Sequence, residues 1–303
     1  MKFIRRVLGW PVGLLLVPTL APGVPAQSTL PPSAESAINR WTMRFTTSRR
    51  RDYEHALTLA QPWAPMVAAK LAAARLPGAL VYLPLVESAY SPWAESSAHA
   101  AGLWQLMPAT ARGLGLEVSD ELDERRDPWK ATDAAIRHLQ DLLRESRGDW
   151  LMTLARYNAG SGRVASRLLR VPHGGVPRRG AYWTVSPLLP TETREYVPQL
   201  LAAYRVGSAP SVYGIRVPAA PRYPPLARVS VPPRTPLAQI ASVWNTTEDE
   251  IRAWNPALQQ RRSPGRWYAL VLPAERAEER QRALASTAML TNSTPGGHVR
   301  GDR

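Results

Sequence analysis

Apolar residues recur at helical spacing in the N-terminal part of the chain. Ile38, Trp41 and Phe45 lie three or four residues apart, which predicts a helix whose apolar face packs inward. The alanine-rich segment 63–75 predicts a second helix, and the Pro-Gly pair after it marks a turn. We therefore expect residues 27–75 to form an N-terminal helical segment.

The next apolar run, residues 79–88, ends in a single carboxylate. It predicts a helix that carries Glu87 near its C-terminal end, with a kink at Pro84 because proline cannot donate the helical hydrogen bond. Residues 91–101 are rich in serine, alanine and proline and show no helical stripe. They predict a loop or a small β-region.

Two aspartates mark further helix starts. Asp127 precedes a proline, and this pair combines an N-cap with a residue that suits the first helical position. Asp149 caps a shorter helix that ends at a glycine. The glycine- and proline-rich segment 171–190 predicts a long surface loop, and Thr191 begins another helix.

The C-terminal third of the chain has a different pattern. Prolines are frequent at 209–225, as expected of a linker. Residues 226–274 combine short apolar strands with two helical stretches, one of which starts with a capping box of Thr247 and Glu250. This segment predicts a small α+β unit. Residues 275–303 are polar or small and predict a tail that is disordered at its end.

Composition narrows the kinds of chemistry that the chain can carry. Its 303 residues, 45% of them hydrophobic, can bury the cores of one or two domains. The sequence has no cysteine, which excludes disulfides and thiolate metal sites. Its five histidines are scattered without the i,i+4 pairing typical of metal ligands, so we expect no metal site.

The formal charge of +14 raises the question of nucleic-acid binding. Only three of the basic residues are lysines, and the arginines are spread along the whole sequence. Basic clusters such as Arg49–Arg51, Arg125–Arg126 and Arg261–Arg262 are short and lie in different regions. The pattern favours a diffuse positive surface, associated peripherally with an anionic cell wall or membrane, over a nucleic-acid site.

The first residues are typical of a secretion signal. Lys2, Arg5 and Arg6 precede a mostly apolar stretch, and small residues at 24–26 suit a cleavage site. An uncleaved membrane anchor is the alternative, but prolines and glycines interrupt the stretch and it is short for a spanning helix. We expect residues 1–26 to be a signal peptide and the protein to be periplasmic or otherwise exported. Lipid anchoring would need a cysteine after the signal, which this sequence lacks.

Glu87 is the leading candidate for a catalytic group. The apolar residues around it, among them Leu83, Leu85 and Val86, would raise the pKa of its carboxyl group and keep it protonated near neutral pH. A protonated carboxyl group in such a position suits acid catalysis on a glycosidic bond.

Several motifs follow Glu87 in a fixed order. Glu87-Ser88 precedes GLWQLMPATA, DPWKAT, YNAG and TETREYVP, and the set runs from about residue 80 to residue 201. The arrangement resembles the lysozyme-like domain of the bacterial lytic transglycosylases, particularly the membrane-bound type D branch. The resemblance implies a mainly α-helical chain with a lysozyme-like catalytic domain at residues 76–208.

Residues 226–274 resemble a LysM module, a small α+β (βααβ) fold that binds N-acetylglucosamine chains. The shared features include the strand at 229–231, the sequence IASVWNTTEDEI and a closing LVLP strand. The family's Gly-Asp-Thr turn is replaced by Arg-Thr-Pro at 234–236. The resemblance therefore implies the fold of the module and leaves its glycan binding open.

The resemblance also implies a reaction. The β-1,4 bond between N-acetylmuramic acid and N-acetylglucosamine in peptidoglycan would be cleaved without water and without a cofactor. Glu87 would act first as acid and then as base, and the C6 hydroxyl of the sugar would close a 1,6-anhydro ring. The matched motifs contain no second carboxylate with a family role. The residues assigned to the substrate cleft are Ser96, Gln105, Met107, Tyr157, Asn158, Glu192 and Tyr196.

Two other functions stay open at this stage. A muramidase on the same fold would hydrolyse the same bond and leave a reducing end. A non-catalytic peptidoglycan-binding protein would need no acid, and the intact motif set around Glu87 argues against it.

Overall fold

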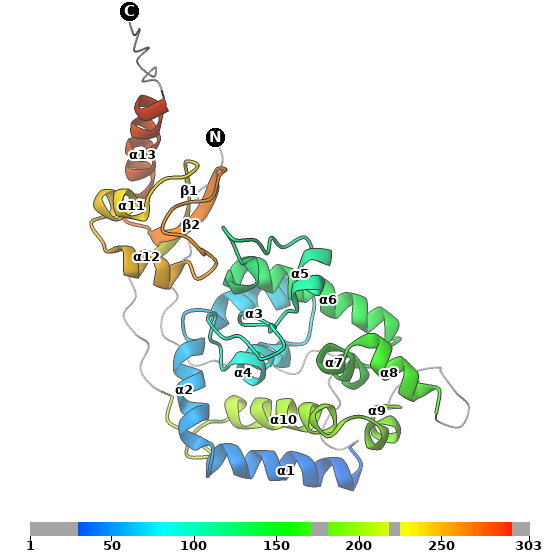
Figure 1. Ribbon diagram of the computed structural model, residues 1–303. Coiled ribbons are helices and arrows are strands. Elements are labelled where there is room, and N and C mark those ends of the chain that lie inside the picture. Colours follow the sequence, from blue (N-terminus) through cyan, green and yellow to red (C-terminus); the bar gives the residue numbers. More distant parts are fainter. Residues whose placement is uncertain (1–29, 171–180, 218–224, 293–303) are drawn as a thin grey trace, which may run out of the picture. The chain divides into compact units, whose positions relative to one another are not determined.

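The computed structural model describes residues 30–170, 181–217 and 225–292 (Figure 1). These residues form two compact units. The larger contains residues 30–117, 124–170 and 181–217, and the smaller contains residues 118–123 and 225–292. The predicted signal peptide lies outside the described residues. Among the described helices, none has both the length and the apolar character that crossing a membrane requires.

Helix α1 (Pro32–Thr46) packs along helix α10 (Thr191–Ser208) in the larger unit (Figure 1). The predicted apolar face of α1 is confirmed, because Ile38, Trp41 and Phe45 are all buried. The indole Nε1 of Trp41 also donates a hydrogen bond of 2.7 Å to the carboxylate of Glu195. The helix therefore forms part of the support for α10.

Short helical elements make up the rest of the larger unit, and its core lies where they meet. Fully buried leucines from four separate segments, such as Leu71, Leu83, Leu103 and Leu139, form part of that core. The remaining elements are α2 (Arg50–Ala60), α3 (Ala64–Ala73), η2 (Gly78–Tyr82), α4 (Leu83–Ser88), α5 (Pro108–Gly113), η3 (Glu124–Arg126), α6 (Pro128–Glu145), α7 (Trp150–Ala159), α8 (Ser161–Leu168), α9 (Ala181–Val185) and η4 (Ser186–Leu188).

The segment that carries Glu87 differs from the kinked helix that we predicted. The chain forms the 3-10 helix η2 and then the α-helix α4, and Pro84 lies in the first turn of α4. Proline fits there because a first-turn N–H has no acceptor within its own helix. Pro84 therefore lies in the first turn of the helix that carries Glu87 near its end.

Residues 94–106 form a loop with β-bridges, as the pattern predicted. Isolated bridges join Glu95 to Ala101 and Ala101 to Leu106. Gly102 has φ +79°, and a Cβ atom at this position would lie 1.9 Å from the carbonyl oxygen of Arg125. Only glycine allows the loop to approach the backbone of η3 this closely.

The predicted caps of α6 and α7 are confirmed. The Asp127 carboxylate accepts hydrogen bonds from the N–H groups of Trp129 and Lys130, and Asp149 accepts one from Met152. The expected loop at 171–190 is only partly described. Residues 171–180 lie outside the described residues, while 181–188 form the short helices α9 and η4, which we did not predict.

The smaller unit contains a two-stranded antiparallel sheet with helices packed around it. Strand β1 (Leu226–Val231) pairs with β2 (Tyr268–Pro273), with Val229 opposite Leu270. Between the strands lie α11 (Leu237–Trp244) and α12 (Glu248–Trp254), and α12 starts with the predicted capping box of Thr247 and Glu250. The predicted fold class, mainly α with a small βααβ module, is confirmed.

The C-terminal segment of the smaller unit forms a helix, which the sequence analysis did not predict. Residues 277–292 form helix α13 (Ala277–Asn292), which packs against β1 and α11. Ala277 and Leu284 are buried, and their burial holds the helix against the module.

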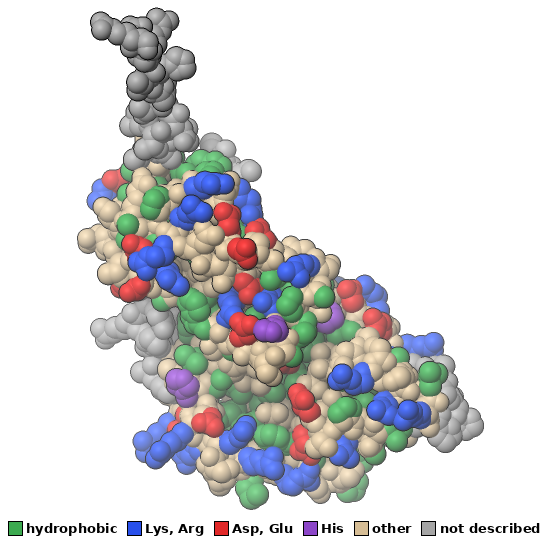
Figure 2. All heavy atoms as spheres, viewed as in Figure 1, with side chains coloured by type: hydrophobic (Ala, Val, Ile, Leu, Met, Phe, Trp, Pro, Cys, Tyr) green, Lys and Arg blue, Asp and Glu red, His purple; other side chains and the backbone are tan. Residues whose placement is uncertain are grey.

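Charged side chains of both signs are interspersed on the visible face of each unit (Figure 2). The basic pair at 125–126 is largely internal, because Arg125 is only 5% exposed and the Arg126 side chain only 11%. This pair therefore contributes to packing within the larger unit.

Candidate active site

Glu87 lies in the last turn of α4 and keeps part of its surface exposed. The helix ends directly after it, because Ala89 and Tyr90 both have left-handed backbone conformations, with φ of 52° and 61°. Tyr90 is buried, and its hydroxyl donates a 2.5 Å hydrogen bond to the carbonyl of Val81. This sharp end leaves Glu87 accessible while the chain turns back into the core.

The environment of Glu87 holds the pKa of its carboxyl group in a range suited to proton transfer. Burial of the carboxyl group has the largest effect and raises its pKa, and the nearby negative charge of Glu192 raises it further. A hydrogen bond from Tyr196 acts in the opposite direction, because it stabilises the carboxylate. The net result is a pKa of about 7, so the group can both donate and accept a proton near neutral pH.

Tyr196 reaches Glu87 from α10. Its side chain is buried, and its hydroxyl donates a hydrogen bond to Oε1 of Glu87. Burial, followed by the neighbouring Glu87 charge, raises the pKa of Tyr196 well above its ordinary value, so the hydroxyl keeps its proton and stays a donor. The sequence placed Tyr196 among cleft residues, and the structure brings it into direct contact with Glu87.

Tyr157 comes from α7, and its hydroxyl donates a 2.7 Å hydrogen bond to the carbonyl of Trp104. Burial raises its pKa most, and the charge of Glu87 raises it further, so the phenol lies within electrostatic range of the candidate acid. The ring of His138 packs against it with centroids 5.5 Å apart. The YNAG and GLWQ motifs therefore meet close to Glu87.

Ser88 connects α4 to the segment that carries the GLWQ motif. The sequence had indicated Ser88 only as the neighbour of Glu87. Its hydroxyl donates a 3.0 Å hydrogen bond to the carbonyl of Leu103. The next residue, Trp104, is fully buried and its indole donates to the hydroxyl of Thr132 at 2.9 Å. Trp104 is therefore a core residue that fixes the GLWQ motif to α6.

Ser96 and Gln105 make local hydrogen bonds within the loop at 94–106. The Ser96 hydroxyl accepts from the N–H of Ala100 at 3.0 Å, and Gln105 Nε2 donates to the carbonyl of Gly102 at 3.0 Å. Both side chains are partly exposed. Their described hydrogen bonds stay within the loop and do not reach Glu87, so their assignment to a substrate cleft stays a prediction.

The remaining predicted residues differ in exposure. Met107 is 43% exposed at the start of α5, and Asn158 is partly exposed next to Tyr157. Glu192 is exposed in the first turn of α10, where the helix dipole favours a negative charge. Glu192, which the motifs placed in the substrate cleft, is close enough to Glu87 for its negative charge to raise the Glu87 pKa.

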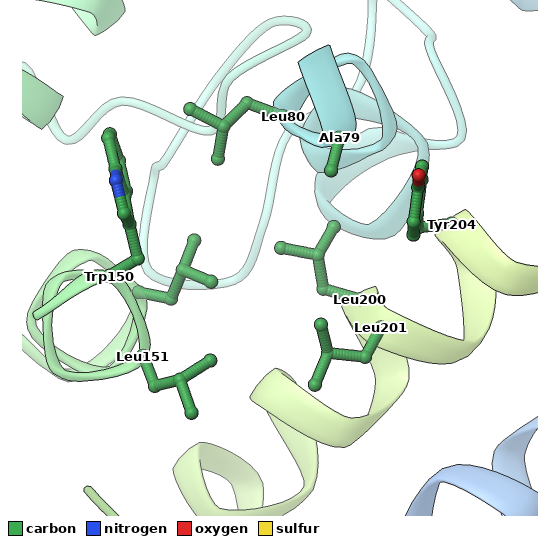
Figure 3. Close-up of a pocket in the computed structure, with 8 residues that line it drawn as sticks. Ala79, Leu80, Trp150, Leu151, Leu200, Leu201 and Tyr204 are labelled. Atoms are coloured by element: carbon green, nitrogen blue, oxygen red, sulfur yellow. The ribbon is translucent and has the colours of Figure 1, made fainter. Parts of the chain in front are cut away.

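The larger unit also contains an apolar cavity of about 20 Å³ (Figure 3). It is lined from η2, α7 and α10 by side chains that include Leu80, Trp150 and Leu200. None of the predicted site residues lines it. We regard it as a packing gap rather than a ligand site, because its lining offers no hydrogen-bonding surface.

Two segments of the chain match known protein families. Residues 65–174 match the family described as Transglycosylase SLT domain. Residues 225–288 match the family described as Lytic transglycosylase MltD, LysM-like domain. The chain therefore contains a transglycosylase SLT domain followed by a LysM-like domain of the MltD type.

The chain is also similar to individual proteins. Over 241 residues the chain is 34% identical to the membrane-bound lytic murein transglycosylase D of Escherichia coli K12, covering 78% of this chain and 52% of that protein. It is 38% identical over 81 residues to the peptidoglycan transglycosylase gp16 of Escherichia phage T7, covering 26% of this chain and 6% of that protein. The chain spans about half the length of the transglycosylase D sequences that it matches.

The solved structures give a further likeness. The 70 kDa soluble lytic transglycosylase of Escherichia coli is 21% identical, with a TM-score of 0.40, over 57% of this chain and 29% of that one.

Proposed function

We propose that the protein is a peptidoglycan lytic transglycosylase. It cleaves the β-1,4 bond between N-acetylmuramic acid and N-acetylglucosamine, and leaves a 1,6-anhydro-N-acetylmuramic acid end. The observation that supports this most is the environment of Glu87, a partly exposed residue whose buried carboxyl group has a pKa of about 7 and accepts a hydrogen bond from Tyr196.

A single carboxyl group with this pKa can perform both halves of the reaction. Protonated Glu87 donates its proton to the glycosidic oxygen while the bond from that oxygen to C1 breaks, and the substrate's N-acetyl oxygen bonds to C1. The Glu87 carboxylate then removes the proton of the C6 hydroxyl. The C6 oxygen bonds to C1 as the N-acetyl oxygen leaves, and Glu87 is protonated again.

The other site residues bind and orient the glycan in this proposal. Tyr157 and Asn158 lie on the α7 side of the cleft, Gln105 and Ser96 lie in the loop at 94–106, and Met107 provides an exposed apolar contact. No cofactor takes part. The substrate places the enzyme outside the cytoplasm at the cell wall, in agreement with the signal-like residues at the start of the sequence.

Digestion of purified sacculi in ¹⁸O-labelled water tests the proposal. Released fragments should carry 1,6-anhydro ends, be one water lighter than hydrolysis products, and contain no ¹⁸O at the new sugar ends. The Glu87→Gln variant, digested in parallel, serves as the control for contaminating activities. Absence of any release by the native protein would contradict the proposed activity as a whole.

A muramidase is the second candidate, and Glu192 is the observation that favours it. A hydrolase needs a base or nucleophile besides the acid, and Glu192 is close enough to Glu87 to raise its pKa. Labelled reducing ends in the same experiment, lost in a Glu192→Gln variant, would establish hydrolysis. Unlabelled anhydro ends that persist in that variant would leave Glu192 a binding or electrostatic role.

A further inference from the structure

The loop that carries Gln105 has an unusual backbone. His99 and Gln105 both have left-handed conformations, with φ of 64° and 46°. Such conformations are unfavourable for residues that carry a side chain, and they persist where neighbouring groups fix them. The backbone between these two residues is therefore fixed by the groups that contact it.

Arg125 contacts this backbone at both ends. Its buried guanidinium donates from Nη1 to the carbonyl of His99 at 2.5 Å and to the carbonyl of Leu106 at 3.2 Å. The first acceptor belongs to one left-handed residue, and the second immediately follows the other, Gln105. Since Gly102 packs against the Arg125 carbonyl, both the side chain and the backbone of Arg125 support the loop.

The candidate active site contacts the same backbone between those two points. Ser88 donates to the carbonyl of Leu103 at 3.0 Å, and Tyr157 donates to the carbonyl of Trp104 at 2.7 Å. The segment from His99 to Leu106 is therefore held at its middle by residues adjacent to Glu87 and at its ends by Arg125. A shift at the ends would move the middle relative to Glu87.

The neighbours of Arg125 make its position rigid. Glu124 is buried, accepts from the N–H of Glu117 at 2.9 Å and forms an ion pair with Lys130. Arg126 donates to the carbonyl of Trp93 at 2.6 Å. Each residue of η3 is thus fixed by hydrogen bonds to the surrounding segments, and Arg125 lies on a rigid support.

We propose that Arg125 is a positioning residue for the reaction. Its guanidinium holds the backbone from His99 to Leu106, and with it Gln105 and the carbonyls that bind Ser88 and Tyr157, in the geometry that Glu87 requires. The inference rests on the proposed transglycosylase function. This role explains why the Arg125 side chain is buried behind the loop, although the two loop carbonyls that it binds could otherwise accept hydrogen bonds from water.

The test compares Arg125→Gln and Arg125→Lys with a matched control, Arg205→Gln. Arg205 is also a mostly buried arginine, with 12% of its side chain exposed, but it links α10 to Asn39 and Glu35 of α1 at 2.7 and 2.9 Å. Two properties are measured in the full-length protein. They are the amide hydrogen exchange of Ala101, Gly102 and Leu106, whose N–H groups bond within the loop, and the kcat and KM for soluble, uncrosslinked glycan strands.

Arg125→Gln should raise exchange at those three amides and lower kcat between about tenfold and a hundredfold, with KM changed less than about threefold. Arg125→Lys should fall between Gln and the native residue, because lysine donates but lacks the planar fork. Arg205→Gln should lower only the melting temperature. Thermal unfolding of each variant confirms that the comparison is made on folded protein.

Unchanged loop exchange in Arg125→Gln would overturn the proposal, and so would raised exchange with an unchanged kcat. A fall in kcat of the same size in Arg205→Gln would overturn it as well, since the effect would then reflect stability alone. Exchange is measured without substrate, so these results are separate from a failure of the proposed function, which would appear as no glycan cleavage by the native protein.

Discussion

The shape of the Glu87 side chain and its acid proton can be separated by a single substitution. Glu87→Gln keeps the size and the hydrogen-bond acceptor of the side chain but removes its exchangeable acid proton. We expect the variant to fold and to lose at least about 10²–10⁴-fold in rate on sacculi, because one group serves both proton transfers. Muropeptide release measures the rate, and retention of activity within a few-fold of the native protein would contradict the assignment.

The same variant should differ from the native protein in stability with pH. The folded-state pKa of Glu87 is about 7, above its ordinary value of 4.5, so the native state binds the proton more tightly than the unfolded state. Stability contributed by the protonated group is full below pH 4.5 and is lost as the pH rises through 7. Above that range Glu87→Gln should be more stable than the native protein by up to about 3 kcal/mol, with no difference at pH 4. Urea unfolding of both proteins at pH 4 and at a pH above 7 measures this difference in the free energy of unfolding.

Two neighbours of Glu87 should shift the pH profile in opposite directions. Tyr196→Phe removes a hydrogen bond that lowers the pKa of Glu87, so the decline of rate at alkaline pH should move to higher pH. Glu192→Gln removes a negative charge that raises this pKa, so the decline should move to lower pH. The kcat profile of each variant provides the measurement. A shift in the same direction for both would mean that these contacts do not control Glu87.

Sequence reasoning succeeded for residues whose roles depend on near neighbours. Asp127 and Asp149 could be found because a cap acts on the next three residues, whereas the assignment of Glu87 as the catalytic group, made from its place at the end of an apolar run, stays a prediction. The contact of Tyr196 with Glu87 could not be derived from spacing, since 109 residues separate them. Only the docking of α10 determines that distance.

At the scale of elements, the loop at 94–106 depends on the absence of a side chain at Gly102. Gly102→Ala should destabilise the protein by about 2 kcal/mol or more, because the new Cβ meets the Arg125 carbonyl and the backbone has φ +79°. Gly162→Ala in α8 is the matched control, since its Cβ meets nothing within 4 Å and alanine favours a helix. Thermal unfolding should show a fall for the first and no fall for the second.

Helix α13 shows why one element escaped prediction. Its sequence is mostly polar, and on local criteria it reads as a tail. Its helix is fixed by burial of Ala277 and Leu284 against the module, a tertiary effect that a local pattern does not contain. In contrast, the capping box of α12 is local and was predicted correctly.

At the scale of the whole molecule, the module at 226–274 should act on attachment rather than on chemistry. Deleting residues 226–303 should leave cleavage of soluble glycan strands intact and reduce retention on sacculi, because a tethered glycan binder raises the local substrate concentration. Sedimentation with sacculi compares the two chains. Thermal unfolding is the control, since the deletion removes Leu258, the bridge partner of Leu122. Equal retention would mean that the module is structural.

The docking of α10, which brings Tyr196 to Glu87, also determines when the Glu87 carboxyl group acquires its raised pKa. A ribosome completes α10 more than a hundred residues after Glu87, and the burial that raises the Glu87 pKa requires that helix to be in place. Before then, the carboxyl group has an ordinary pKa and is ionised at neutral pH. A nascent or unfolded chain thus lacks the protonated carboxyl group that the proposed function requires, and gains it only when α10 has docked.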